Sequence, residues 1–261
     1  MKIDKEFYVS HIQGDEFIFK MRQVLDNVEM VLNNHRLEST DFLDPYERYL
    51  ARTVLNRFED IKYLEDGGLD ESERKIISLY PFYFQEEEIE EKISFLKIEF
   101  PRVELAHKDF LGAILNLGIS REKLGDLYIH SGYTFVIVKR EIKDYILYNL
   151  TKISNFNVRI KEIEREALEA SEKEYKEINK FVSSLRLDST ISAIYNLSRQ
   201  KSLKLIKSDR VKINFKPVNK PSIELNEGDL LSVKGFGRSI FHSINGTSKK
   251  GNYNITIRII I

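Results

Sequence analysis

Residues 186–206 read RLDSTISAIYNLSRQKSLKLI and hold two amphipathic patterns in succession. The first has an aliphatic stripe at steps of four, three and three residues, formed by Leu187, Ile191, Ile194 and Leu197. Such spacing predicts a helix of about three turns with one apolar face. Ser198 then offers an N-cap for a second helix, from Arg199 to about Ser208. The stretch therefore predicts a pair of short consecutive helices.

The second predicted helix separates its apolar residues from its basic ones. At roughly 100° per residue, Leu203 and Ile206 fall on one side. Lys201 and Lys204 project from nearly the opposite side. One face can therefore join a core while the other presents cations.

The residues that follow alternate as a strand does. In residues 211–216 (VKINFK), apolar side chains interleave with basic or polar ones, which predicts one apolar and one basic face. Turns are predicted at residues 228–229 (GD), 235–238 (GFGR) and 245–246 (NG), the last a strong signal for a two-residue hairpin. Alternation over residues 253–259 predicts a final strand.

The charge of the chain is zero overall but unevenly distributed. From Phe181 onward there are 14 Lys or Arg against 5 Asp or Glu, a balance of +9, so the preceding residues carry −9. Such asymmetry points to a C-terminal segment that attracts polyanions, nucleic acid above all.

A helical N-terminal domain is predicted over residues 1–75. Its first long helix has an apolar stripe formed by Ile18, Met21, Leu25, Val28 and Leu32. Asp44 and Pro45 give a good N-cap and first-turn pair for a second helix, which Gly67 and Gly68 are expected to stop.

Residues 76–163 alternate β-rich runs with two helical patterns in the order βαββαβ, so an α+β chain with a central ferredoxin-like or RNA-recognition-motif-like sandwich is predicted. Residues 76–84 are a candidate extra strand of this sandwich. The acidic run at 85–91 suggests that it faces protein or solvent rather than phosphate, and core positions are expected for its aromatics Phe95, Phe100, Tyr128 and Phe135. Residues 164–180, highly charged, are expected to form a solvated helical connector to a domain at 181–261.

The absence of cysteine excludes disulfides and thiolate metal sites. The opening MKIDKEFYVSHIQGDE lacks the apolar run of a signal peptide or membrane span, so a cytoplasmic protein without membrane insertion is expected. The five histidines show no metal-ligand spacing, and no nucleophile sits beside a recognisable base. No catalytic residues, metal or cofactor are therefore predicted.

The C-terminal motifs resemble the αL RNA-binding domain of the ribosomal-protein S-four type, a pair of short helices packed on a small twisted sheet. The matching motifs are, in order, Arg186-Leu187-Asp188, Ser198-Arg199, Leu205-Ile206, Val211, Asn214, Pro221-Ser222 and Gly228-Asp229. The resemblance implies binding of structured RNA through the helix pair and the adjoining hairpin. With the basic faces, it gives as RNA-binding residues Arg186, Ser198, Arg199, Gln200, Lys201, Lys204, Lys207, Lys212, Asn214, Lys220 and Arg238.

Upstream, residues 42–45 (FLDP), 67–75 and 107–126 (HKDFLGAILNLGISREKLGD) resemble the YlmH family of bacterial proteins. The likeness covers nearly the whole chain. It implies a non-catalytic factor that binds rRNA and tRNA on the large ribosomal subunit, in rescue or quality control of stalled peptidyl-tRNA complexes. The N-terminal domains would then contact ribosomal or rescue proteins.

Alternatives remain open. Any single lysine of the basic face is as easily explained by solvation, and Arg186 could be a structural partner of Asp188. The S-four type of module is often appended to RNA-modifying enzymes, so such an enzyme is one rival function. A cell-division scaffold is another, because the YlmH family is associated with division gene neighbourhoods.

Overall fold

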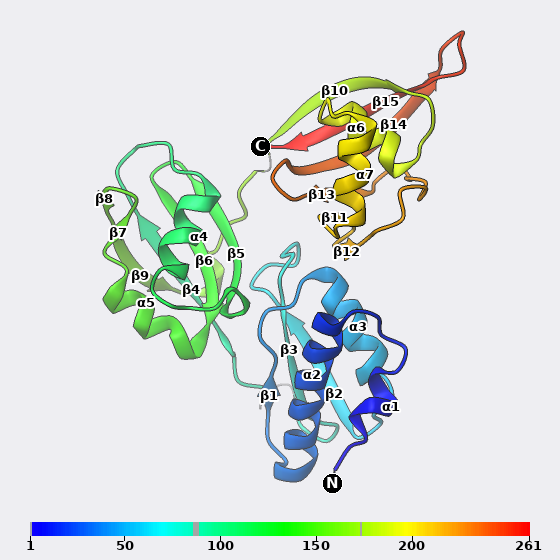
Figure 1. The fold of residues 1–261 in the computed structure, drawn as a ribbon. Coiled ribbons are helices and arrows are strands. Elements are labelled where there is room, and N and C mark those ends of the chain that lie inside the picture. The colour runs from blue at the N-terminus through cyan, green and yellow to red at the C-terminus, as the bar shows by residue number, and fades with distance from the viewer. Residues whose placement is uncertain (1, 86–88, 173) are drawn as a thin grey trace. The chain divides into compact units, whose positions relative to one another are not determined.

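The computed structural model describes residues 2–85, 89–172 and 174–261. The chain divides into two compact units, residues 1–171 and residues 172–261 (Figure 1). Part of the predicted acidic run, residues 86–88, and residue 173 of the predicted connector lie outside the described residues.

The N-terminal part of the first unit is a three-stranded antiparallel sheet, in the order β1-β3-β2, with helices packed on it. Its elements are α1 Lys5–Val9, α2 Asp15–Asn34, β1 Glu38–Ser39, α3 Pro45–Leu55, β2 Ile61–Asp66 and β3 Ile76–Pro81. The predicted stripe of α2 enters the core, where Met21, Leu25 and Val28 are fully buried. Asp44 caps α3 as predicted: its Oδ1 accepts from the amide of Glu47 at 2.9 Å, and the Glu47 carboxylate accepts from the amide of Asp44 at 2.8 Å.

The prediction of a helical domain over residues 1–75 is wrong in its second half. α3 ends at Leu55, well before Gly67 and Gly68, and β2 pairs with β3 along its whole length. β3 therefore completes this sheet and is not an extra strand of the following sandwich, and the predicted boundary at residue 75 cuts a hairpin in two. Every position of β3 is buried, so its sequence has no alternation to reveal which sheet it joins.

The rest of the first unit has the predicted βαββαβ order. Its elements are β4 Ile93–Glu99, α4 His107–Leu115, β5 Leu124–His130, β6 Tyr133–Lys139, α5 Lys143–Asn149, β7 Lys152–Ile153, β8 Phe156–Asn157 and β9 Arg159–Ile163. Antiparallel pairing gives the sheet order β5-β6-β4-β9, and β7 and β8 form a separate small hairpin. The aromatics expected in the core are all buried there: Phe95, Phe100, Tyr128 and Phe135.

Buried side chains join the two sheets of the first unit. Phe42 and Phe95 belong to one apolar cluster that also buries Leu168. Lys139 is only 5% exposed, and its Nζ donates to Ser39 Oγ at 2.6 Å and to the carbonyl oxygen of Thr40 at 2.9 Å. Burial lowers the pKa of Lys139 to about 8.

The second unit is a six-stranded antiparallel sheet in the order β10-β15-β14-β13-β11-β12. Its elements are β10 Tyr175–Val182, α6 Leu187–Ile194, α7 Arg199–Lys207, β11 Val211–Ile213, β12 Lys216–Pro217, β13 Leu230–Val233, β14 Gly237–Thr247 and β15 Tyr253–Ile260. The predicted helix pair packs on one face of this sheet, where Ile191 and Ile206 share a core with Val211, Leu231 and Ile257.

The predicted solvated helical connector is wrong. Leu168 is buried in the first unit, and residues 175–182 form strand β10, which pairs along its length with β15. The partner lies more than seventy residues later in the sequence, so no local pattern indicates the pairing.

Two predicted details of the hairpins also differ. The strand that begins at Val211 ends at Ile213, because Asn214 and Phe215 both have positive φ, +49° and +69°, and form the turn to β12. Phe215 therefore leaves the apolar face. Residues 245–246 are not a hairpin turn but lie at a register shift inside β14, and the turn follows at residues 248–252.

Candidate nucleic-acid interface

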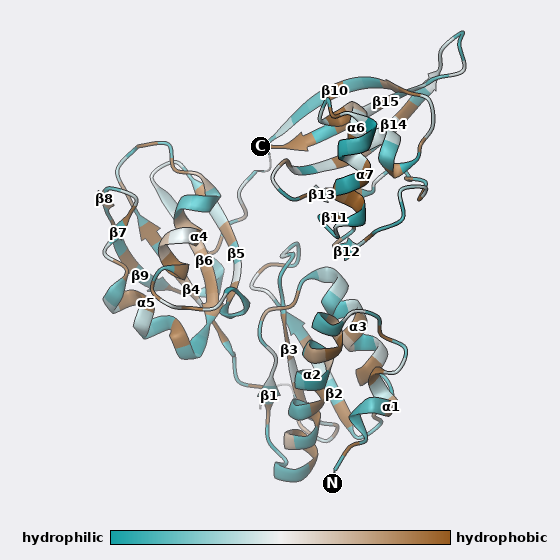
Figure 2. Ribbon diagram, viewed as in Figure 1, coloured by the Kyte–Doolittle hydropathy of each residue, from teal (hydrophilic) through white to brown (hydrophobic). Residues whose placement is uncertain are grey.

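Helix α7 presents a row of polar and basic side chains to solvent. Ser198 caps it as predicted, with its Oγ accepting from the amide of Lys201 at 3.3 Å. Leu205 and Ile206 are buried against the sheet. The exposed residues are Arg199, Gln200, Lys201, Lys204 and Lys207. The α7 ribbon therefore shows hydrophilic and hydrophobic colours in succession (Figure 2).

A buried carboxylate lies beneath the start of this helix. Asp188, whose side chain is 2% exposed, accepts from Arg186 Nε at 3.1 Å and from Arg186 Nη2 at 3.2 Å. Arg199 Nη2 lies 3.7 Å from the same carboxylate, although the Arg199 side chain is 77% exposed. Burial acts to raise the pKa of Asp188, but the bonds and charge of Arg186, with the Ser189 amide and Arg199, lower it overall.

These contacts give Arg186 and Arg199 different roles. The fork of Arg186 is held on Asp188, which is the structural role left open by the sequence. Arg199 is anchored only loosely and points outward. A charge-assisted pair of this kind fixes the direction of the guanidinium that it holds.

A hollow of about 390 Å³ opens beside this pair. Its lining includes Arg186, Arg199 and Asp188, together with four serines, Ser183, Ser184, Ser189 and Ser192. The hydroxyl of Ser192 donates to the carbonyl oxygen of Leu197. Guanidinium and hydroxyl donors at one surface suit a phosphate or a ribose.

Asn214 and Lys220 differ in how free they are to bind. The amide of Asn214 is engaged by the fold: its Nδ2 donates to Asp229 Oδ1 at 2.7 Å, and its Oδ1 accepts from the amide of Leu230 at 2.9 Å. Asn214 thus holds the β11–β12 turn against β13. Lys220 is exposed.

Lys212 and Arg238 lie on the other face of the sheet. Their neighbours Val211 and Ser239 point toward the helix pair. Val211 is buried in the core, and Ser239 Oγ lies 3.2 Å from the hydroxyl of Tyr195, the C-cap residue of α6. Successive side chains of a strand point to opposite faces. The predicted single surface is therefore divided between two faces of the module.

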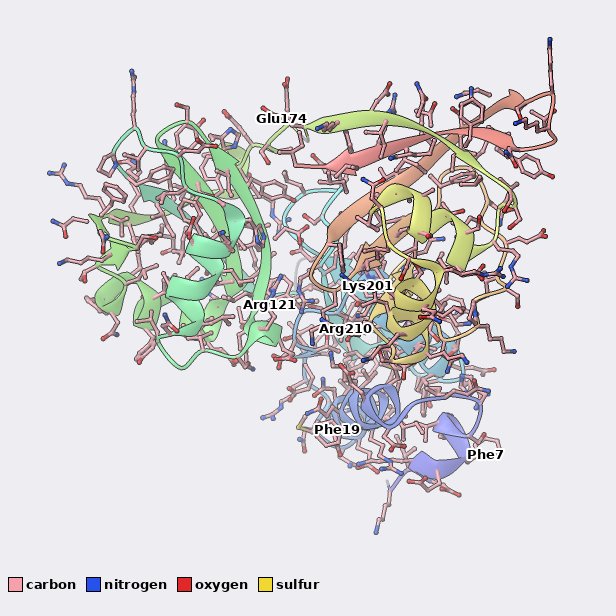
Figure 3. The ribbon with its side chains drawn as sticks, turned by 45° about the horizontal axis from the view of Figure 1, so that its top comes forward. Phe7, Phe19, Arg121, Glu174, Lys201 and Arg210 are labelled. Atoms are coloured by element: carbon pink, nitrogen blue, oxygen red, sulfur yellow. The ribbon has the colours of Figure 1, made fainter. Side chains whose placement is uncertain are left out.

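Three residues that the sequence did not single out extend the α7 surface. Arg210 and Lys234 are exposed and adjacent, because the amide of Lys234 donates to the carbonyl oxygen of Arg210 at 2.9 Å. Lys201 Nζ lies 5.6 Å from the ring centroid of Phe236, which places that ring beside α7. Figure 3 labels Lys201 and Arg210. The sequence signal for Arg210 is its place in the basic C-terminal segment, just after the predicted second helix.

Elsewhere the described residues contain no group of three or more His, Asp or Glu side chains placed to hold a metal ion. Over the same part of the chain, no helix is long and apolar enough to cross a membrane.

Comparison with known families divides the chain into three matched segments. Residues 16–84 match the family described as "YlmH, N-terminal", residues 86–167 match "Putative RNA-binding domain in YlmH", and residues 185–231 match the S4 domain. One curated relative, the "Ribosome-associated protein quality control protein P2" of Bacillus subtilis (strain 168), is 33% identical over 248 residues, 94% of this chain and 96% of its own length.

A solved structure shares the fold of part of the chain. The "Cell division protein ylmH from Streptococcus pneumoniae" superposes with a TM-score of 0.53 at 21% identity, covering 60% of this chain and 97% of that chain.

Proposed function

The chain belongs to the YlmH family, and we propose that it is a non-catalytic, cytoplasmic RNA-binding factor that docks on rRNA and tRNA of the large ribosomal subunit. Its task would be quality control of stalled peptidyl-tRNA complexes, in keeping with the name of the relative from Bacillus subtilis. One observation carries the proposal: α7 turns four cations outward while burying its other side on the sheet.

The physical basis is neutralisation of phosphates. Arg199, Lys201, Lys204 and Lys207 come from one rigid helix, so little conformational entropy of the backbone is lost when they meet a polyanion. Gln200 adds an amide that can bond to a ribose hydroxyl or a base edge. Folded RNA, with phosphates at regular spacing, matches such a row better than an isolated anion does.

The test is the salt dependence of binding to ribosomal RNA and to tRNA. For about five phosphate contacts, log K falls with log[salt] with a slope of about −3.5 to −4.5. Replacing Arg199, Lys201 and Lys204 together by alanine should flatten that slope by about two to three units. The matched control replaces three exposed lysines of the first unit, Lys2, Lys62 and Lys108, and should leave it unchanged. An unchanged slope in the α7 variant removes that helix from the site.

The first unit would position the module or recruit a ribosomal or rescue protein. Its second part is interpreted as an RNA-recognition-motif-like sandwich, supported by the strand order β5-β6-β4-β9. Its aromatics Phe95, Phe100, Tyr128 and Phe135 are buried, so base stacking is assigned to none of them.

Crosslinking of the full chain to RNA in cells, followed by sequencing, distinguishes binding to rRNA, binding to tRNA and absence of RNA binding in one measurement.

A further inference from the structure

The last thirty-two residues of the chain contain no acidic side chain. Over residues 230–261 the basic residues are Lys234, Arg238, Lys249, Lys250 and Arg258. Almost all of this stretch lies beyond the match to the S4 domain, which ends at residue 231. Strands β14 and β15 therefore add a cationic segment that the helix-pair site does not include.

Part of this charge lies on the sheet face turned away from the helices. Lys212 of β11 is paired with Ser232 of β13, and Ser232 with Arg238 of β14, so the three residues form one row across the sheet. The guanidinium of Arg238 lies 5.3 Å from the ring centroid of Phe215, which holds it at the sheet surface. Arg258, farther along this face, is neutralised by Glu177 at 2.7 Å.

The remaining charge is at the tip of the β14–β15 hairpin. The two strands stay paired as far as Thr247 and Tyr253, and the turn between them is closed by a bond from the Ser248 amide to the Asn252 carbonyl oxygen at 2.7 Å. Lys249 and Lys250 are exposed within this turn. The hairpin extends away from the rest of the module, at the red end of the colour scale (Figure 1).

The hairpin is bent by two irregularities in its strand pairing. Two register shifts, between Phe241 and Ser243 and between Ile244 and Gly246, interrupt the pairing of β14 with β15. Bulges of this type increase local twist and redirect a strand. Asn245 Nδ2 donates to Thr256 Oγ1 at 2.7 Å across the second shift, so the bent form is fixed by a side-chain bond.

We propose that the row Lys212–Ser232–Arg238 and the hairpin tip at residues 248–252 form a second surface for the sugar–phosphate backbone of RNA, distinct from the α7 surface. The proposal rests on the proposed function, because it assumes that the ligand of the module is RNA. An exposed pair of lysines on a narrow projecting arm can enter a groove or follow a second strand, while the row near Phe215 contacts phosphates beside it. An RNA bound at both the α7 surface and this second surface would be held in one orientation.

The experiment uses the full chain and deproteinised ribosomal RNA from Bacillus subtilis as the probe. The hairpin variant is Lys249→Ala with Lys250→Ala, whose side chains are exposed and outside the core. Its slope of log K against log[salt] should be flatter by about 1.4 to 1.8 units, two contacts at about 0.7 to 0.9 each. In hydroxyl-radical footprints, the hairpin variant should no longer protect a set of nucleotides that the α7 triple variant still protects. Lys62→Ala with Lys108→Ala, the same loss of charge in the first unit, is the matched control.

The outcomes separate the two proposals. A slope that changes in the α7 variant but not in the hairpin variant overturns the second surface and leaves the proposed function standing. Loss of the same nucleotides in both variants also overturns it, since the hairpin would then belong to the first surface. If neither variant changes the slope, both proposals fall. A further variant, Arg238→Gln, should remove about one more unit of slope, and a retained slope takes the row out of the surface.

Discussion

Asp188→Asn should destabilise the helix pair and at the same time release its arginines. The carboxylate is almost fully buried and accepts two bonds from the fork of Arg186, with Arg199 Nη2 at 3.7 Å. Asparagine keeps the shape but removes the charge, and it turns one acceptor oxygen into a donor that faces a guanidinium. Both changes act on a group that water does not reach.

The expected loss follows from that geometry. A hydrogen bond to a charged group contributes about 1.5 to 3 kcal/mol, and breaking a fully buried ion pair costs about 3 to 5 kcal/mol. The Arg186 side chain is 39% exposed, so water solvates it once it is released, and the lower range applies. The free energy of opening of α6 should therefore fall by about 1.5 to 3 kcal/mol.

Native-state hydrogen exchange of the full chain measures this loss on peptides from α6 and α7. Asp209→Asn is the matched control, because Asp209 is exposed and asparagine tolerates its positive φ of +53°. Because the pKa of Asp188 is lowered in the fold, its contribution is present above the usual carboxylate range and is lost as pH falls through the folded pKa. Equal opening energies in the two variants, or a difference that persists in strong acid, would refute the assignment of Asp188.

Three further results are expected. Ser198→Ala removes the N-cap of α7 and should lower the opening free energy of that helix by about 0.5 to 1 kcal/mol in hydrogen exchange, near the low end for such caps because the bond is 3.3 Å long. Asn214→Ala loses two bonds to the β13 segment and should destabilise β11 by about 1 to 3 kcal/mol; unchanged RNA affinity of the folded protein would assign it a structural role, and a selective loss of affinity would contradict that. Lys139 should titrate near pH 8 by NMR, and because its folded pKa lies below the usual 10.5, stability should rise by up to about 3 kcal/mol between pH 8 and 10.5, a rise absent from Lys139→Met.

Local chemistry made the helix pair and the caps predictable from the sequence. The stripe from Leu187 to Ile194, the N-cap at Ser198 and the capping residues at Asp44 act within a few residues of where they stand in the chain. Each therefore leaves a pattern in a short window. The exposed row on α7 followed directly, because helical periodicity fixes which side chains share a face.

Strands that pair across long distances in the sequence were not predictable in the same way. β10 looks like a charged connector, and only its pairing with β15 makes it a strand. β2 likewise depends on β3, whose six buried positions carry no alternation. The division of the basic residues between two faces was missed because alternation separates Lys212 from Val211 but does not tell which face of the sheet the helix pair covers.

Three acidic residues of the C-terminal module direct their carboxylates toward groups of the fold. Of its five carboxylates after Phe181, Asp188 is buried on Arg186, Asp229 accepts from Asn214 Nδ2 and the Asn226 amide, and Glu227 accepts from the Ile244 amide at 2.6 Å. Asp229 and Glu227 are thus bonded to neutral groups, namely backbone amides and an asparagine. These bonds direct the carboxylate oxygens toward the fold. Arg186 is the cation held most closely by this internal set. Other cations lie on α7, on the sheet row and at the hairpin tip, so a polyanion meets a potential set by cations on two faces of the module.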